Sequence, residues 1–81
     1  MIEVYTKSYC PFCWRAKELL SSKKYEFEEI DAEEEEHFEE MVKRSGRTKV
    51  PQIFVNGKHI GGCDELYDLD EKGKLAKILK K

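Results

Sequence analysis

The chain of 81 residues carries 15 basic and 17 acidic side chains, which gives a formal net charge of −2. This length fits one domain over residues 1–81, and the near-neutral charge provides no general attraction to nucleic acid. Hydrophobic and charged residues each make up 40% of the chain, a balance that excludes wholesale disorder and a membrane-embedded protein. We expect a monomer that has neither nucleic acid nor a membrane as a partner.

The N-terminal part of the chain predicts a strand, a helix and a second strand. Residues 2–6 are mostly β-branched or aromatic, as is typical of strands. Apolar side chains then recur on one helical face, at Phe12, Ala16, Leu19 and Leu20. Aromatic and aliphatic residues within 25–30 indicate the second strand. Such a strand–helix–strand unit implies parallel pairing through a right-handed crossover.

The C-terminal part predicts a helix, a hairpin and a helical segment. A helix over 33–45 is expected to end at Gly46. Two short strands within 53–60 flank an Asn-Gly pair, the strongest short hairpin signal. The helical segment comprises a short helix over 64–70 and a last amphipathic helix around 75–79, with basic residues near its end: Lys77, Lys80 and Lys81. The elements predict an α/β fold, a four-stranded mixed sheet with helices on both faces (β-α-β-α-β-β-α).

Two of the three cysteines, Cys10 and Cys13, lie where the first strand gives way to the helix. An odd, small cysteine count is unlike a secreted disulfide scaffold, and no secretory leader is visible, so we expect a cytoplasmic protein. Pro11 suits the first helical position, where no N–H partner is needed. This makes Cys10 the N-cap, whose sulfur faces free N–H groups and the positive end of the helix dipole. Both favour the thiolate.

Cys13 lies one turn further along the same face and is expected to be more buried and less ionised. The pair is therefore predicted to be asymmetric, with Cys10 attacking and Cys13 resolving by closing a disulfide. A structural disulfide would gain little from so short a loop. A zinc site could draw on a larger set, namely Cys10, Cys13, Cys63 and one of His37 or His59, but the spacing matches no finger pattern. We expect redox chemistry and no metal.

Several separated motifs resemble those of glutaredoxins, above all the small bacterial dithiol members. The motifs are Lys7, Cys10-Pro11-Phe12-Cys13, Arg47 to Pro51, and Gly61-Gly62-Cys63-Asp64. They occur in family order and spacing across essentially the whole chain. The resemblance implies a thioredoxin-like fold and a glutathione-dependent oxidoreductase that reduces protein–glutathione mixed disulfides and protein disulfides. It implies glutathione as co-substrate and, as a family-level candidate among protein partners, ribonucleotide reductase.

The resemblance also implies how glutathione is held around the cysteines. Pro51 would be a cis-proline facing them, and the backbone of Val50 would pair with the cysteine of glutathione. Lys7 would approach the glycine carboxylate, and Phe12 would form a wall of the groove.

The second half of the implied site lies at a helix start after Gly62. There the N–H groups of Cys63 and Asp64 would receive the γ-glutamyl carboxylate, as helix N-termini bind anions. An acidic side chain, Asp64 or Glu65, would meet the ammonium group. For Cys63 the backbone is expected to matter more than the sulfur.

Three positions depart from the family pattern. Phe12 stands where tyrosine is usual, and Lys49 stands where threonine is common. Lys49 either attracts the carboxylates of glutathione or faces solvent. Phe38 occupies the place of a glutamine or arginine that helps to bind the glycine carboxylate, and His37 and Arg47 are the two candidates to replace it.

Two alternatives to a glutathione-dependent enzyme follow from these departures and from the cysteines. The first is a redoxin that receives electrons from a thioredoxin reductase. The second is a module in which two chains share an iron–sulfur cluster through Cys10 and glutathione, against which Pro11 argues by the family's pattern. His59, after the hairpin turn, is expected at the surface.

Overall fold

The computed structural model describes residues 1–79, so the predicted basic residues Lys80 and Lys81 lie outside the described part. The elements in order are β1 (Ile2–Thr6), α1 (Pro11–Ser22), β2 (Phe27–Asp31), α2 (Glu35–Ser45), β3 (Gln52–Val55), β4 (Lys58–Gly61), α3 (Cys63–Glu71) and α4 (Lys74–Leu79). The predicted order is confirmed, and its final helical segment is divided into α3 and α4. In the described residues, no helix is long and apolar enough to cross a membrane.

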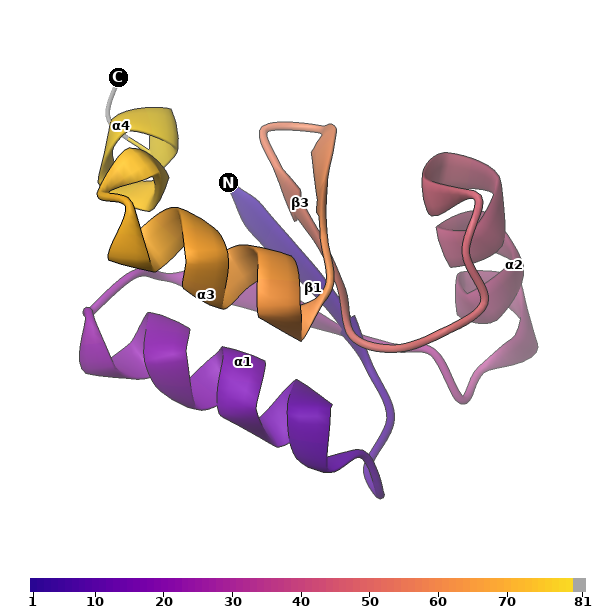
Figure 1. Ribbon diagram of the computed structural model, residues 1–81. Coiled ribbons are helices and arrows are strands. Elements are labelled where there is room, and N and C mark those ends of the chain that lie inside the picture. The colour runs from indigo at the N-terminus through magenta and orange to yellow at the C-terminus, as the bar shows by residue number, and fades with distance from the viewer. Residues whose placement is uncertain (80–81) are drawn as a thin grey trace.

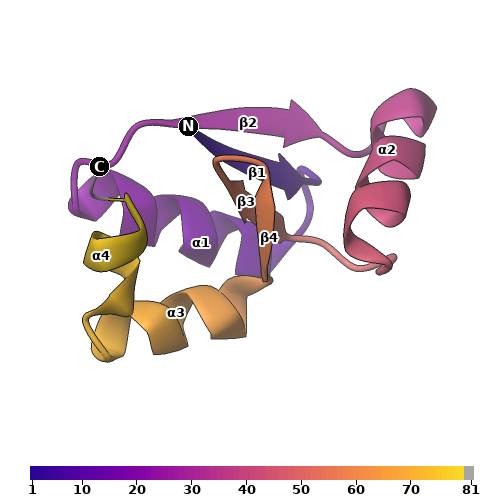
Figure 2. The same cartoon turned by 90° about the horizontal axis from the view of Figure 1, so that it is seen from above.

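The strands form one four-stranded sheet in the order β2-β1-β3-β4. β1 pairs in parallel with β2 and antiparallel with β3, and β3 and β4 form an antiparallel hairpin. Helices α1, α3 and α4 lie together on one side of this sheet (Figure 1). Helix α2 lies apart from them on the other side (Figure 2). The predicted mixed sheet with helices on both faces is therefore confirmed.

The two faces of the sheet have different cores. The face toward α1 and α3 is aliphatic and is built from Ile2, Val4, Ala16, Leu20, Ile53, Val55, Leu66 and Leu75. The face toward α2 is smaller and contains Tyr5, Ala32, Met41 and Phe54. There the Arg44 guanidinium lies 4.0 Å from the centre of the Phe54 ring. It also bonds Tyr5 Oη and Glu3 Oε1, each at 2.8 Å.

Local signals in the sequence account for the ends of the elements. Gly46 takes the left-handed conformation (φ 72°) after α2, and its N–H donates to Val42 O at 2.7 Å. Asn56 and Gly57 both have positive φ, 52° and 83°, as a tight hairpin turn requires. Since β1 and β3 are antiparallel, with Tyr5 opposite Gln52, the end of β1 meets the start of β3. The loop into α1 and the turn into β3 therefore share one edge of the sheet.

Candidate active site

Cys10 caps the start of α1, as the sequence predicts. Its backbone is extended (φ −99°, ψ 111°), and Pro11 opens the helix. The Cys13 N–H donates to Cys10 Sγ at 3.3 Å, and the Trp14 N–H donates to Cys10 O at 3.2 Å. The sulfur thus lies at the positive end of the helix dipole, where a thiolate gains a backbone donor.

The turn before β3 faces this sulfur. The Cys10 thiol donates to Val50 O over 3.6 Å. The Val50–Pro51 peptide bond is cis, which confirms the predicted conformation of Pro51. The Cys10 sulfur is therefore held between a helix start on one side and a backbone carbonyl on the other.

The cysteines differ in exposure, and the pKa values of two of them are raised. Cys10 is half-buried, whereas Cys13 is 1% exposed. Burial, together with a hydrogen bond to Cys10, raises the pKa of Cys13 to about 12. Burial, reinforced by the neighbouring carboxylate of Asp64, also raises the pKa of Cys63. Cys13 and Cys63 are thus thiols at neutral pH, and Cys13 is the more buried member of the pair, as the sequence predicts.

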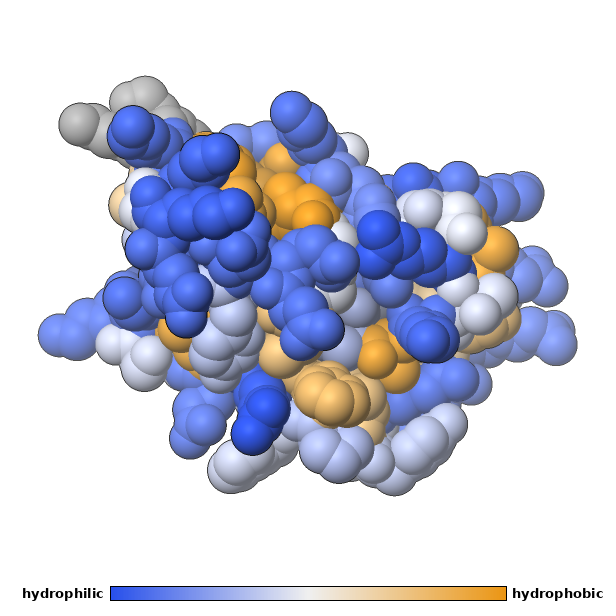
Figure 3. Space-filling view, viewed as in Figure 1, coloured by the Kyte–Doolittle hydropathy of each residue, from blue (hydrophilic) through white to orange (hydrophobic). Residues whose placement is uncertain are grey.

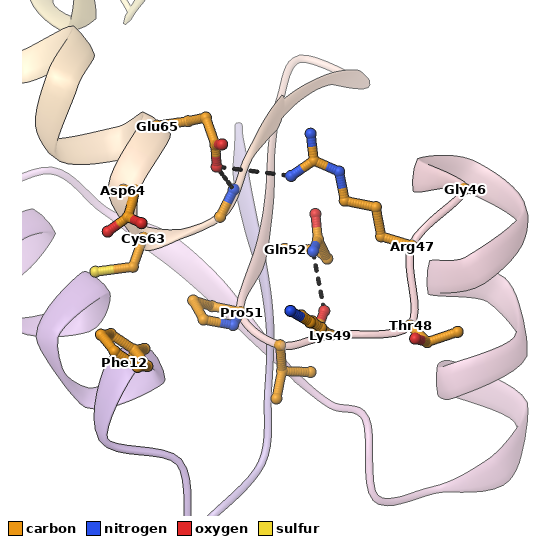
Figure 4. A pocket seen from close by; sticks show the side chains of 12 residues that line it. Phe12, Gly46, Arg47, Thr48, Lys49, Pro51, Gln52, Cys63, Asp64 and Glu65 are labelled. Atoms are coloured by element: carbon orange, nitrogen blue, oxygen red, sulfur yellow. Dashed lines mark hydrogen bonds and ion pairs between the residues drawn. The ribbon is translucent and has the colours of Figure 1, made fainter.

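A groove of about 640 Å³ lies beside the cysteines, between the start of α1, the turn before β3 and the start of α3. Its lining includes seven residues of the predicted glutathione site: Phe12, Lys49, Val50, Pro51, Gly62, Cys63 and Asp64. In the close-up view, Phe12 and Cys63 lie on one side of Pro51, and Thr48 lies on the other (Figure 4). On the molecular surface, a hydrophobic patch over the start of α1 interrupts a mostly hydrophilic face (Figure 3).

Two glycines allow the chain to pass close to the groove. A Cβ on Gly62 would lie 3.1 Å from Pro51 O, so a side chain there would press on the turn that faces Cys10. Gly61 has a φ of +123°, and a Cβ there would lie 2.7 Å from the Cγ of Glu65. Both positions therefore favour glycine, which brings the start of α3 against the turn before β3.

The start of α3 provides donors to the groove. As residues of the first turn, Cys63 and Asp64 have backbone N–H groups without an intrahelical partner. Glu65 is already engaged: its Oε1 accepts from the Gly62 N–H at 2.6 Å and lies 3.6 Å from Arg47 Nη1. The Gly62 bond, more than the nearby Arg47, lowers the pKa of Glu65. Asp64 is exposed at the groove.

The three basic residues expected near the glycine carboxylate lie in different places. Lys7 is absent from the groove lining, and its Nζ lies 4.9 Å from the centre of the Phe38 ring. His37 Nδ1 lies 3.0 Å from Asp31 O, at the start of α2 and away from the groove. Arg47, by contrast, lines the groove. Of the two expected substitutes, the structure brings only Arg47 to the site.

Sequence reasoning missed Gln52 and misplaced His59. Gln52 is 2% exposed and lines the groove. His59 is half-buried, not a surface residue, because its ring packs on Phe54 at 5.0 Å between centres. Its Nε2 lies 2.7 Å from Gln52 Oε1. The one sequence signal for this pair is that a polar residue, Gln52, opens an otherwise apolar strand. Within the part of the chain that the structure describes, no group of three or more His, Cys, Asp or Glu side chains is placed to hold a metal ion.

Comparison with known proteins agrees with this geometry. The glutaredoxin family model matches residues 2–60. Glutaredoxin 3 of Escherichia coli strain K12 is 58% identical over 81 residues, which cover 98% of this chain and 96% of that protein. The solution structure of glutaredoxin from Brucella melitensis has 51% identity and a TM-score of 0.86, over 98% of this chain and 87% of that one. A crystal structure of a buckwheat glutaredoxin–glutathione complex has 32% identity and a TM-score of 0.87, and the match covers 96% of this chain and 74% of that one.

The fold and the cysteine pair are therefore those of a thiol–disulfide oxidoreductase with a thioredoxin-like architecture. The chain belongs to the glutaredoxin family. The resemblance that the separated sequence motifs indicated is confirmed over nearly the whole chain.

Proposed function

We propose that this chain reduces protein–glutathione mixed disulfides and protein disulfides, with glutathione as the electron donor. One observation carries the proposal: the half-buried Cys10 sulfur caps α1 beside a groove that offers backbone donors and basic side chains. A tripeptide with two carboxylates and a free amine matches such a lining. That the 32% identical buckwheat protein was solved as a glutathione complex supports the same ligand here.

Each part of the groove then has a role toward glutathione. The backbone of Val50 pairs with its cysteine, beside Pro51, while Phe12 covers one side. Lys49 and Arg47 attract the glycine carboxylate, and Lys7 adds positive charge from beyond the lining residues.

At the start of α3, the N–H groups of Cys63 and Asp64 receive the γ-glutamyl carboxylate. Gly62 leaves room for this approach, and the exposed Asp64 carboxylate meets the ammonium group. We place the whole site in a single domain, residues 1–81, acting as a cytoplasmic monomer.

Reduction of a mixed disulfide needs only Cys10. Its thiolate attacks the glutathione sulfur, a Cys10–glutathione disulfide forms, and the bond to the protein sulfur breaks. The protein leaves as a thiolate that takes a proton from water. A second glutathione, as its thiolate, attacks the bound glutathione sulfur. Oxidised glutathione leaves and the Cys10 thiolate is restored, so one free glutathione is consumed and the disulfide bond passes from the protein sulfur to that glutathione.

Reduction of a protein disulfide uses both cysteines. Cys10 attacks one sulfur and forms a mixed disulfide with the protein. Cys13 then loses its proton and attacks Cys10 Sγ, which closes the Cys10–Cys13 disulfide and releases the second protein thiolate. Two glutathiones reduce this disulfide in turn. The disulfide of a ribonucleotide reductase is a family-level candidate substrate.

The test is turnover of a glutathionylated peptide, with either glutathione and its reductase or a thioredoxin reductase as the donor system. We expect turnover with glutathione only, and a loss of about a thousandfold or more in Cys10→Ser. Turnover with the thioredoxin reductase alone would show that the donor has been misassigned. Activity retained by Cys10→Ser would show that the nucleophile has been misassigned.

A further inference from the structure

Gln52 is a buried polar side chain inside the groove whose two polar atoms are both used. Its Nε2 donates to Lys49 O at 2.9 Å, and its Oε1 lies 2.7 Å from His59 Nε2. Because Oε1 can only accept, the proton of His59 is on Nε2. His59 is itself fixed by its packing on Phe54. The carboxamide therefore connects β4 to the turn before β3.

The bond to Lys49 O determines how the next peptide group lies. The Lys49–Val50 peptide is trans, so its C=O and N–H point in opposite directions. With the Lys49 C=O turned inward to Gln52, the Val50 N–H turns outward. Val50 lines the groove, and in residues 1–79 its N–H donates to no protein acceptor. The Val50 C=O lies on the Cys10 side.

We propose that Gln52, held by His59, is a positioning residue that presents the Val50 N–H to the peptide backbone of a bound glutathionyl group. The inference rests on the proposed function and adds a residue to it. Both polar atoms of Gln52 are used within the protein, so its effect on the substrate is indirect. It fixes the orientation of a backbone donor, so its effect falls on substrates that contain an amide and leaves the nucleophile intact.

This separation gives a direct test in the Cys13→Ser background, where only Cys10 reacts with the substrate. Single-turnover rate constants are measured for a glutathionylated peptide and for bis(2-hydroxyethyl) disulfide, which has no amide group. We expect Gln52→Met to lower the rate constant for the peptide by about tenfold, the worth of one well-placed hydrogen bond. The rate constant for the amide-free disulfide should stay within about twofold, because Cys10 and its helix are untouched.

Three further variants guard against a merely structural effect. Gln52→Glu keeps an acceptor for His59 but no donor for Lys49 O, so it should reproduce the loss even if Gln52→Met folds poorly. His59→Phe keeps the ring on Phe54 and removes the N–H, so we expect a smaller loss for the peptide, about threefold. Thr6→Val is the matched control, because it removes a buried hydroxyl that bonds Glu29 Oε2 at 2.7 Å, outside the groove. It should not change the ratio of the two rate constants.

The possible results separate this inference from the function on which it rests. Equal losses for both substrates in Gln52→Met, or no loss for either, would overturn the positioning role. If the Cys13→Ser parent does not prefer glutathionylated peptide over the same peptide capped with 2-mercaptoethanol, the proposed function fails instead. A preference that Gln52→Met leaves unchanged keeps the function standing and removes Gln52 from it.

Discussion

The two ends of the site are built in opposite ways. The reacting end, defined as Cys10 to Cys13, consists of consecutive residues whose arrangement follows from one helix start. The holding end, defined as residues 47–52 together with the start of α3, brings together segments far apart in the sequence. The first is fixed by local backbone geometry, and the second by packing of the β3–β4 hairpin and α3.

This difference determines how each end should respond to substitution. The reacting end depends on single sulfur atoms, so a substitution there removes a whole chemical step. The holding end shares its interactions among backbone N–H groups and several side chains. Its substitutions should therefore give graded losses of binding.

After the loss expected in Cys10→Ser, the largest effect concerns Cys13, the proposed resolving cysteine. In Cys13→Ser, turnover of a glutathionylated peptide should stay near the wild-type rate, because that route needs only Cys10. Reduction of a protein disulfide should fall by roughly a hundredfold, because an intramolecular thiol is lost. Both rates are measured with glutathione and glutathione reductase. Equal losses on the two substrates would show that Cys10 and Cys13 do not have separate roles.

The raised pKa of Cys13 predicts that the reduced protein loses stability at alkaline pH. Its pKa is above the ordinary value of 9.0 and reaches about 12 in the fold. A raised pKa in the folded state contributes stability that is complete below the ordinary value and is lost as pH rises toward about 12. The free energy of unfolding of the reduced protein, measured in urea between about pH 8 and pH 11, should fall less steeply in Cys13→Ala. Parallel pH profiles for the two proteins would contradict this.

At the holding end, Lys49→Gln should raise the KM for a glutathionylated peptide by about two- to fivefold and leave kcat unchanged, as expected for one exposed charge. The difference should shrink at high salt. Lys58→Gln is the matched control, because Lys58 is exposed in β4 and is absent from the groove lining. An unchanged KM would show that Lys49 only faces solvent.

The smallest expected effect is a loss of folding stability at acid pH, caused by His59 beside the holding end. Burial, with the charge of Arg47, lowers the pKa of His59 below 6.5. Protonation therefore favours the unfolded state, so stability is complete above about pH 6.5 and decreases as pH falls below it. His59→Phe should flatten the profile of unfolding free energy between about pH 7.5 and pH 5. A steeper acid loss in this variant would mean that His59 is not held neutral.

The same contrast explains what the sequence could predict. Pro11 alone identifies Cys10 as the N-cap, and the Asn-Gly pair identifies the hairpin, because each depends on neighbours in the chain. The bond from Gln52 to His59 depends on how β4 lies against β3, which no local pattern encodes. The contact of Lys7 with Phe38, between the loop before α1 and α2, likewise depends on tertiary packing.

Glutaredoxin motifs could still place most of the groove, since the resemblance carries tertiary information that residue spacing lacks. The lining includes Phe12, Lys49, the turn at Val50 and Pro51, and the α3 start as expected. What the resemblance could not supply is the effect of this chain's own departures. Arg47, not His37, is the basic side chain that reaches the groove beside them.

The pairing of β3 with β4 has a practical consequence for engineering this scaffold. Ile53 pairs with Gly61 but Phe54 pairs with His59, so the register shifts and Ile60 is the extra residue. A deletion between His59 and Gly62 would remove this extra residue from the strand that leads into α3. Loop grafts and tags are better placed at the exposed turn of Asn56 and Gly57. The length of β4 therefore bears on where α3 begins relative to the groove.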